Sequence, residues 1–561
     1  MNPASLPLAV QATLPLALVV IGAIAGMIWP ASALPPIDRW LNHRAAPWLA
    51  AAITALALRS VWGGLDAVPT IHDEAAYLLQ ASMLAHGHLV GPARPLPEFF
   101  EQFHVFVTPV LAARYPPGFA LALVPGIWLG LPGLMPVILT GLTGGLLFAL
   151  VRRIATPSIA LLAWALWVVT PGNLRFRPTY LTESLSGLLW LAAWCSLLEW
   201  RETGKRGWLL ALSAALSWQA ITRPLTAIAF AIPIGIVVLL AVWRTRLWRE
   251  LVPAFALGLI LTSVVPWQNH QVTGNWRLTP LKQYSVVYFP FDLPGFGYDS
   301  TPPLRPWPTD FKQFSEHFGP MHREFTPDRL PGILVRRSGN ILHDAWGRWW
   351  PSFAVLGVMG LAVGGSSVLF AMATCLTLVL LYLTFAHADN WTVYYIETEA
   401  VTIAIVAIGA GWLVRWAAAR RKEPAPLVAN RAAVGLALLS IVVFMTWSRS
   451  LREARGTTRF ISFDQDRFRH QVTRLAGPAI VFIRYASDHD VNKSLIANEY
   501  DLGRAYVWLV YDRGMDNRRL MALAPGRIPY RYDEERHRFT RLAEDGISTL
   551  RAATADSAAA R

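Results

Sequence analysis

Residues 225–243 read LTAIAFAIPIGIVVLLAVW, an apolar run without a charged side chain. Its length is close to the roughly 20 residues that a helix needs to cross the hydrocarbon of a bilayer. Similar runs recur over roughly the first 450 residues, and we predict spans near 8–30, 46–62, 132–150, 157–171, 179–198, 207–222, 225–243, 251–267, 351–364, 366–386, 395–413 and 432–447. The chain is therefore predicted to be a polytopic α-helical membrane protein with about twelve spans.

The composition also indicates a membrane protein. Of 561 residues, 54% are hydrophobic and 15% are charged, and the mean hydropathy is +0.37. Soluble domains usually contain about one quarter charged residues. The formal net charge of +14 would suit a nucleic acid, but most Lys and Arg residues lie in short loops between apolar runs and towards the C-terminus. Membrane topology explains the loop residues, so we predict no nucleic-acid partner.

Basic residues of the short loops set the orientation in the membrane. The first apolar run lacks a basic segment before it and is longer than a signal-peptide core, so we expect it to remain as a span. Threading the spans alternately through the bilayer places the following residues on one side: Arg39, Arg44, Arg152, Arg153, Arg201, Lys205, Arg206, Arg244, Arg246, Arg249, Arg415, Arg420, Arg421 and Lys422. The positive-inside rule makes that side the cytoplasm.

Three long pieces then lie on the opposite side, where we expect the chemistry. They are a loop at about 63–131, a loop at about 268–350 and the region 448–561. The last piece lacks the apolar pattern and is predicted to contain strands at Ala479–Tyr485, Ala505–Tyr511 and Ile528–Tyr532 and a helix at Asp516–Leu523. We therefore divide the chain into a transmembrane catalytic region, 1–447, and a small extracytoplasmic α/β domain, 448–561.

The first external loop contains two adjacent carboxylates. Residues 71–77 read IHDEAAY, and the apolar positions in 78–86 fit a short amphipathic helix. Asp73 and Glu74 can accept a proton from an acceptor hydroxyl, or coordinate a cation that neutralises a phosphate. A structural alternative stays open, because acidic residues in the first turn of a helix complement its dipole.

Four more ionisable residues lie at external ends of apolar runs. Arg175, Arg177 and Arg223 break the positive-inside pattern in very short loops. A guanidinium suits a phosphate through its paired donors, and the alternative is snorkelling towards lipid headgroups. Glu183 lies near the start of an apolar run, where an ionisable group is costly without a partner. It is a functional candidate, or it forms a structural ion pair with Arg175 or Arg177.

A family resemblance rests on the order of these features. A span is followed by Asp-Glu-Ala-x-Tyr at 73–77, Tyr-Pro-Pro-Gly at 115–118, a span that ends in Val-Arg-Arg at 151–153, and a carboxylate, Glu183, at the start of a later helix. This order resembles that of GT-C fold glycosyltransferases. More narrowly, it resembles the bacterial relatives of protein O-mannosyltransferases and of the aminoarabinose transferase that modifies lipid A.

The resemblance implies a hexosyl or pentosyl transferase in the bacterial cytoplasmic (inner) membrane, with its active site facing the periplasm or the cell exterior. The implied donor is a polyprenyl-phosphate sugar, with inversion at the anomeric carbon, and the implied acceptor is a protein, lipid A or a glycan. An acidic residue of the first loop acts as the general base in the family, and Asp73 matches it, with Glu74 as its neighbour. Glu183 matches the second carboxylate of related enzymes.

One departure from the family concerns the donor phosphate. Relatives often carry Lys or His directly before the Pro-Pro pair, whereas Tyr115 stands here and Arg114 precedes it. Arg114 can supply the missing charge. Topology adds Arg175, Arg177 and Arg223 to the candidate phosphate-binding residues.

Metal chemistry has weaker support in the sequence. Beside His72 and Tyr77, which are further loop candidates, stand His86, His88 and His104, but their spacing matches no compact ligand motif. The two cysteines, Cys195 and Cys375, lie in apolar runs. We predict no metal site and no required cofactor, and a divalent cation stays an open alternative.

Two other functional classes compete with the enzyme. A secondary transporter usually shows two related halves and polar groups near the membrane midplane. This chain shows no evident halves, and its charged candidates gather at one external face. The third hypothesis is a membrane scaffold whose C-terminal domain binds a partner and which has no catalytic activity. It predicts that Asp73 is dispensable for the function of the protein.

Overall fold

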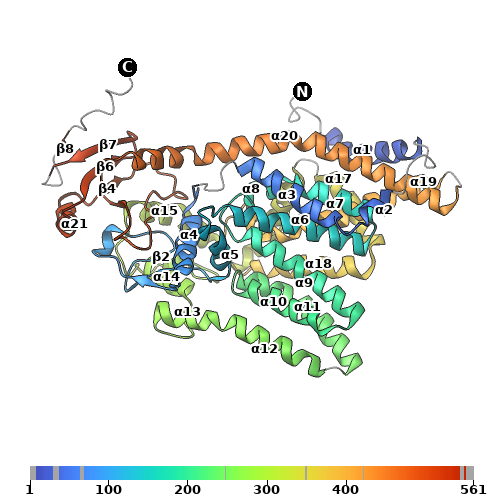
Figure 1. The fold of residues 1–561 in the computed structure, drawn as a ribbon, viewed down its shortest axis with the longest axis horizontal. Helices are drawn as coiled ribbons and strands as arrows, with labels where there is room; N and C mark the ends of the chain where they lie inside the picture. The colour runs from blue at the N-terminus through green and yellow to red at the C-terminus, as the bar shows by residue number, and fades with distance from the viewer. Residues whose placement is uncertain are drawn as a thin grey trace, which may run out of the picture. The chain divides into compact units, whose positions relative to one another are not determined.

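A computed structural model gives the structure of the chain and describes residues 8–28, 37–62, 68–246, 248–347, 350–420, 423–543 and 549–550 (Figure 1). The chain divides into two compact units, each built from three segments. The helical unit comprises Met1–Leu65, Gly133–Val264 and Pro327–Thr458. The loop unit comprises Asp66–Pro132, Val265–Thr326 and Arg459–Arg561. Arg421 and Lys422, which the positive-inside rule assigns to the cytoplasm, lie outside the described residues.

The helical unit consists of helices, most of which are apolar. They are α1 (Leu8–Ile28), α2 (Ile37–Leu41), α3 (Ala46–Trp62), α6 (Leu134–Ile154), α7 (Pro157–Val168), α8 (Pro171–Phe176), α9 (Glu183–Thr203), α10 (Arg206–Ala220), α11 (Pro224–Thr245), α12 (Leu251–Thr262), α16 (Leu330–Trp346), α17 (Trp350–Val363), α18 (Gly365–Tyr382), α19 (Glu397–Ala419) and most of α20 (Ala425–Thr473). Each predicted span overlaps one of these helices.

Not every one of these helices is long enough to be a span by itself. Among the described residues, six helical stretches are long and apolar enough to cross a membrane: Leu134–Ile154, Pro224–Thr245, Trp248–Thr273, Gly365–Tyr382, Glu397–Ala419 and Ala425–Val443. The number of about twelve spans therefore stays a prediction.

Glycines allow α6 to pack closely against α3. A Cβ atom at Gly145 would lie 2.7 Å from the carbonyl oxygen of Pro47, and one at Gly141 would lie 2.9 Å from that of Ala51. Side chains at these two positions would push the helices apart. Small residues at helix contacts are typical of membrane proteins, where association depends on van der Waals packing between backbones that approach closely.

The loop unit has both helices and strands. Its helices are α4 (His72–Ala85), α5 (Gly118–Trp128), α13 (Val264–Thr273), α14 (Pro280–Tyr288), α15 (Thr309–Glu324) and α21 (Asn517–Leu523). Three short strands form one antiparallel sheet in the order β1-β3-β2: β1 (Gly91–Pro92), β2 (Val105–Phe106) and β3 (Val110–Ala113). The helix expected from residue 78 begins earlier, so that it includes Asp73 and Glu74 in its first turn.

A second sheet lies in the C-terminal segment. Its strands are β4 (Ala479–Arg484), β5 (Val507–Tyr511), β6 (Ile528–Asp533), β7 (Arg538–Leu542) and β8 (Thr549–Leu550), in the order β5-β4-β6-β7-β8. β4 pairs in parallel with β5 and β6, and the remaining pairs are antiparallel. The three predicted strands and the predicted helix, now α21, are confirmed with shifts of a few residues at their ends.

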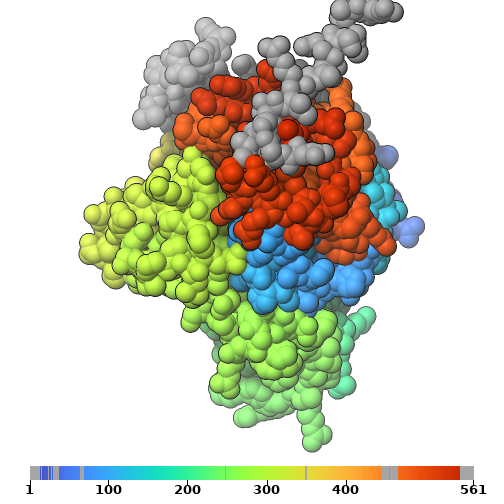
Figure 2. Space-filling view, turned by 90° about the vertical axis from the view of Figure 1, so that its left-hand side faces the viewer, coloured from blue at the N-terminus to red at the C-terminus, as the bar shows by residue number. Residues whose placement is uncertain are grey.

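The C-terminal sheet shares a hydrophobic core with the first loop. Ile480 and Phe482 of β4 and Trp508 of β5 belong to one buried cluster with Phe99 and Phe100. Figure 2 shows the C-terminal residues, in orange and red, directly against the blue surface of the first loop. Burial of apolar surface holds these distant segments together.

Helix α20 continues beyond the end predicted for the last span. The apolar pattern stops at about residue 447, but the helix runs on to Thr473. No proline interrupts residues 427–477, and Gly477, with φ of +68°, and Pro478 follow soon after its last turn. Such residues commonly follow helix C-termini. Hydropathy thus marks where the helix becomes polar and not where it ends.

Candidate active site

The first turn of α4 is fixed by Glu74. Its Oε2 accepts hydrogen bonds from the backbone N–H of Ile71 at 3.1 Å and from the hydroxyl of Thr70 at 2.8 Å, and also from the backbone N–H of Thr70. A glutamate at this position of a helix commonly reaches back in this way to the N-terminal backbone. The side chain is buried. These contacts support the structural alternative for Glu74.

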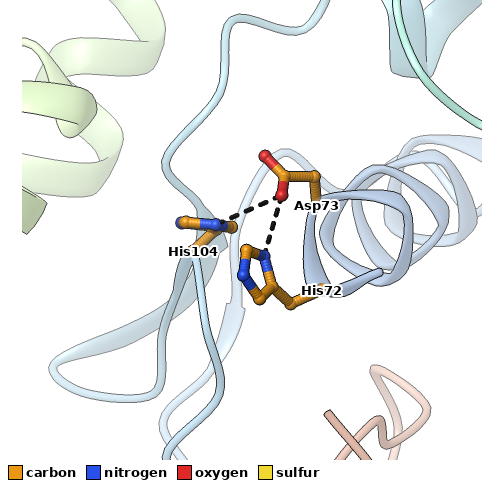
Figure 3. A group of neighbouring side chains, drawn as sticks. All are labelled: His72, Asp73 and His104. Atoms are coloured by element: carbon orange, nitrogen blue, oxygen red, sulfur yellow. Dashed lines mark ion pairs between the residues drawn. The ribbon is translucent and has the colours of Figure 1, made fainter. Parts of the chain in front are cut away.

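Asp73, its neighbour, faces His72 and His104 instead, as Figure 3 shows, and it also contacts Tyr115. Its Oδ2 lies 2.8 Å from Nδ1 of His72 and 3.5 Å from Nε2 of His104. The hydroxyl of Tyr115 donates a hydrogen bond to Oδ1. The Asp73 side chain is 29% exposed, whereas those of His72 and His104 are 7% and 4% exposed. The carboxylate is thus supported by buried rings and remains accessible.

The β2–β3 hairpin brings His104 to this carboxylate. Val105 pairs with Ala113 in an antiparallel register. The preceding residue of one strand, His104, therefore lies opposite the residue that follows the other strand, Arg114. The N–H of Arg114 donates to the carbonyl of His104 at 2.9 Å, and the N–H of His104 donates to the Tyr284 hydroxyl at 2.9 Å. His104 has φ of +62°, which is uncommon for a residue other than glycine. The hairpin holds this conformation.

Tyr115 is fixed at both its ends. Its carbonyl oxygen accepts hydrogen bonds from Nε2 of Gln80 at 3.0 Å and from Nε2 of Gln268 at 2.9 Å. Its ring stacks on that of Tyr77, with the centroids 4.5 Å apart. Tyr77, one turn after Asp73 on α4, therefore orients the tyrosine that bonds to the carboxylate.

The protonation states follow from this environment. Burial raises the pKa of the Asp73 carboxyl, but the adjacent His104 and His72 outweigh this effect and hold that pKa well below its usual range. Burial lowers the pKa of the His104 ring, and Arg114 acts in the same direction. Burial, and then Asp73, raise the pKa of Tyr115. At neutral pH the site thus holds a carboxylate, a neutral imidazole and a phenol that donates.

Arg114 lies beside this group. Its guanidinium carbon is 5.3 Å from the ring centre of Tyr115 and 5.2 Å from that of Tyr284. Its Nη1 lies 3.3 Å from Oδ2 of Asp292, and the side chain is 11% exposed. The structure therefore places a cation next to Asp73 within the same unit.

The other predicted residues belong to the helical unit and do not form one arginine cluster. Nη1 of Arg223 lies 3.4 Å from Glu183 and 3.3 Å from Glu397, and all three side chains are buried. Arg177 is also buried and donates to the backbone carbonyl of Glu183 at 2.8 Å. Arg175, in α8, is exposed. The carboxylate of Glu183 thus pairs with Arg223 and not with Arg175 or Arg177.

Glu397 and His104 were not singled out as site residues by the sequence. Glu397 lies at the start of the apolar run 395–413, where the argument used for Glu183 applies equally. His104 gave no local signal, because the hairpin alone brings it to Asp73. Of the other loop histidines, His86 and His88 lie near Tyr500, with ring centroids 5.0 and 6.0 Å away.

Three side-chain atoms, one from each of His72, Asp73 and His104, lie close enough together to hold a metal ion. One ligand atom each from His72, Asp73 and His104 lies within 4.8 Å of the other two. No other group of three such residues in the described part of the chain meets this criterion.

No protein-family model matches the sequence, and no curated protein matches it. Among solved structures, the chain is similar to ArnT, the lipid A aminoarabinose transferase, from Cupriavidus metallidurans bound to undecaprenyl phosphate, with a TM-score of 0.50 and 14% identity over 88% of this chain and 91% of that one. The chain has the GT-C fold. ArnT in its apo state gives a TM-score of 0.48 at 14% identity, covering 81% of this chain and 85% of that one.

The GT-C fold also occurs in a further similar structure. The apo oligosaccharyltransferase of Archaeoglobus fulgidus gives a TM-score of 0.38 at 11% identity, over 79% of this chain and 63% of that one. The similarity to ArnT confirms the GT-C fold that the resemblance implied, and with the six apolar helices it identifies an integral membrane protein.

Proposed function

We propose that the chain is a glycosyltransferase that moves a sugar from a polyprenyl-phosphate donor to an extracytoplasmic acceptor, with Asp73 at the reacting centre. One observation carries the proposal. Asp73, at the start of α4, is partly exposed and ionised, and the fixed side chain of Arg114 lies beside it. The GT-C fold supports it, and ArnT, which shares this fold, has been crystallised with undecaprenyl phosphate.

The proposed reaction has one leaving group and one proton to move. The acceptor hydroxyl oxygen forms a bond to the anomeric carbon while the bond from that carbon to the phosphate oxygen breaks. The phosphate leaves with the electron pair, and the Arg114 guanidinium stabilises the charge that develops on it. Attack on the face opposite the leaving group inverts the anomeric carbon.

Asp73 takes the acceptor proton in this scheme. Oδ1 accepts one hydrogen bond, from Tyr115, which leaves a lone pair for the acceptor. General-base assistance of this kind contributes about 10²–10⁴-fold to a rate. Glu74 is proposed to fix the helix start, and Glu183 and Glu397 are proposed to hold Arg223 within the helical unit. Phosphate binding by Arg175, Arg177 and Arg223 stays a prediction from topology.

The location and the acceptor complete the proposal. The positive-inside rule supports an active site on the periplasmic or outer face of a bacterial inner membrane. The acceptor is a protein, lipid A or a glycan, and the donor carries a hexosyl or pentosyl group. The alternative function is a secondary transporter of a small or lipid-linked substrate, and the following test separates it from sugar transfer.

The direct test uses purified chain in lipid nanodiscs with a radiolabelled sugar on polyprenyl phosphate and a membrane extract that supplies acceptors. The proposal predicts loss of the donor with stoichiometric release of polyprenyl phosphate and label on a larger product. Hydrolysis alone, or movement of intact donor across a sealed vesicle without bond cleavage, would contradict it.

A further inference from the structure

The C-terminal segment supplies a hydrogen-bond acceptor to the helix that carries Asp73. The first N–H groups of an α-helix have no partner within the helix. At the start of α4, the N–H of His72 donates to the backbone carbonyl of Asn492 at 3.2 Å. Asn492 belongs to residues 486–493, which follow β4 and which we call the β4 loop. The β4 loop thus contacts the helix turn that positions Asp73, although the two lie far apart in the sequence.

Hydrogen bonds from two other elements hold the beginning of the β4 loop. Nε2 of Gln313, in α15, donates to the carbonyl oxygens of Ala486 at 3.2 Å and Ser487 at 2.9 Å. The N–H of Ala486 donates to Oε2 of Glu534, the residue after β6, at 2.9 Å. These contacts fix the loop where it leaves β4, but they do not reach its far end, where Asn492 lies.

His489 connects the far end of the β4 loop to Glu534. Its Nδ1 lies 2.7 Å from Oε1 of Glu534, and its Nε2 lies 2.8 Å from the carbonyl oxygen of Lys493, the residue after Asn492. An ionised carboxylate and a backbone carbonyl only accept hydrogen bonds, and a neutral imidazole carries one N–H. Both contacts are therefore hydrogen bonds only when the ring is an imidazolium. The His489 side chain is 2% exposed, so water has little access to it.

The electrostatic environment favours the charged ring. The titratable groups of the elements around it are Glu534 after β6, Asp310 of α15, Tyr485 at the end of β4, and Asp488, Asp490 and Lys493 of the loop itself. Burial lowers the pKa of His489, but Glu534 outweighs this effect, Asp310 acts in the same direction as Glu534, and the pKa is raised above its ordinary value of 6.5. Burial raises the pKa of Asp310 to about 6, so Asp310 is mostly ionised at neutral pH. Asp490 and Lys493 pair with each other at 3.5 Å.

We propose that His489 is a positioning residue for Asp73. As an imidazolium it ties the β4 loop to Glu534, so that Asn492 holds the first turn of α4. Loss of one ring proton removes one of the two hydrogen bonds and releases the end of the loop. The effect on sugar transfer rests on the proposed function, whereas the link from His489 to α4 rests on the contacts alone.

The sign of the pH dependence follows from the charged form. Because the folded state favours the imidazolium, the hold on α4 is complete below the ordinary pKa of a histidine and is lost as the pH rises through the raised pKa of His489. The β4 loop therefore sets an alkaline limit on the activity, whereas ionisation of Asp73 sets the acid limit. The C-terminal segment thereby acts on the reaction without contact with the substrate.

Hydrogen exchange of the full-length protein in nanodiscs tests the link without an activity assay. Exchange of the peptide that contains His72 is followed from about pH 6 to pH 9 and corrected for the intrinsic rate. In the wild type, we expect its protection to fall about 2–10-fold across this range, as one hydrogen bond is lost. His489→Gln, which stays neutral, should show the lower protection throughout. His470→Gln, at an exposed histidine of the same unit, is the matched control and should behave as the wild type does.

A second variant changes the pKa of His489 and keeps the ring. Glu534→Gln removes the charge that favours the imidazolium, so the midpoint of the exchange transition should move down by about 1–2 pH units. Glu535→Gln, at the exposed neighbouring residue, should leave the midpoint in place. Because the ring is intact in Glu534→Gln, this variant tests the proposal even where His489→Gln does not fold.

Transfer kinetics connect the link to the chemistry. His489→Gln should lower kcat by about 10-fold near pH 6.5, leave KM for the donor unchanged and remove the alkaline limb of the kcat profile, because Asp73 is displaced and the donor site is not. An alkaline limb that stays in place in His489→Gln overturns the proposal. So does a His72 peptide that exchanges equally in this variant and the wild type, or a midpoint that does not move in Glu534→Gln, even where sugar transfer is observed. Exchange that depends on pH through His489 upholds the link even where no sugar is transferred, and only the proposed function then fails.

Discussion

Replacing Tyr115 by Phe removes one hydroxyl from the site and little else. The hydroxyl donates to Oδ1 of Asp73, while the ring stacking on Tyr77 and the hydrogen bonds from Gln80 and Gln268 to the Tyr115 carbonyl do not depend on it. A hydrogen bond to a charged group contributes about 1.5–3 kcal/mol. Because the donor favours the ionised carboxylate, its loss raises the pKa of Asp73.

The consequence is a displaced pH profile with a defined sign. At about 1.36 kcal/mol per pKa unit, the lost hydrogen bond moves the acid limb of kcat/KM upward by about 1–2 pH units. The ionised carboxylate is the working form, and in the wild type its pKa lies well below the usual range. Tyr115→Phe therefore loses activity on acidification at a higher pH than the wild type does, and keeps its activity near neutrality. The assay is the initial rate of sugar transfer across this pH range.

A matched control separates this effect from a general disturbance. Tyr298→Phe makes the same change in the loop unit at a ring that packs on Phe291, 5.7 Å between centroids, and its profile should match that of the wild type. An acid limb that stays in place in Tyr115→Phe, with a normal melting temperature, would refute a hydrogen bond between Tyr115 and a catalytic Asp73.

Two further substitutions test the cations. Arg114→Gln should raise KM for the donor about 10–100-fold, because a charge-assisted contact to the phosphate is lost. The control is Arg504→Gln, at a side chain that is 76% exposed, which should leave this KM unchanged. Equal KM values for the two variants in donor titrations would show that Arg114 does not bind the phosphate. Arg223→Met should destabilise the helical unit by about 3–5 kcal/mol, because Glu183 and Glu397 lose their buried partner, and the exposed Arg175→Met is its control. Unchanged thermal unfolding of Arg223→Met in detergent would show that the pairing is energetically unimportant.

Much of the fold could be predicted because membrane helices are encoded locally. An apolar run must form its backbone hydrogen bonds within itself in lipid, so each predicted span falls on a helix. The C-terminal strands were predicted for a similar reason, since β4 and β5 are short runs of β-branched and aromatic residues. The length of α20 was not predicted, because its second half is polar and hydropathy reports burial in lipid and not helicity.

Only the part of the site that lies within one continuous sequence motif could be predicted. Asp73 was identified from its motif and topology, and the structure surrounds it with hydrogen-bonding and ionic partners. The role of Glu74 as an acceptor for Thr70 and Ile71 could not be predicted. Two adjacent acidic residues give the same sequence pattern whichever of the two faces outward. His104 reaches Asp73 through the register of a short hairpin, and a single sequence contains no signal for such a non-local pairing.

The central claim is that Asp73 acts on the reacting atoms, and single-turnover transfer by Asp73→Asn tests it most directly. With enzyme in excess over labelled donor, we expect the chemical step to slow by about 10²–10⁴-fold while donor binding is retained. Asp299→Asn, at an exposed aspartate of the same unit, should react at the wild-type rate. A chemical step in Asp73→Asn as fast as in the wild type would contradict the account.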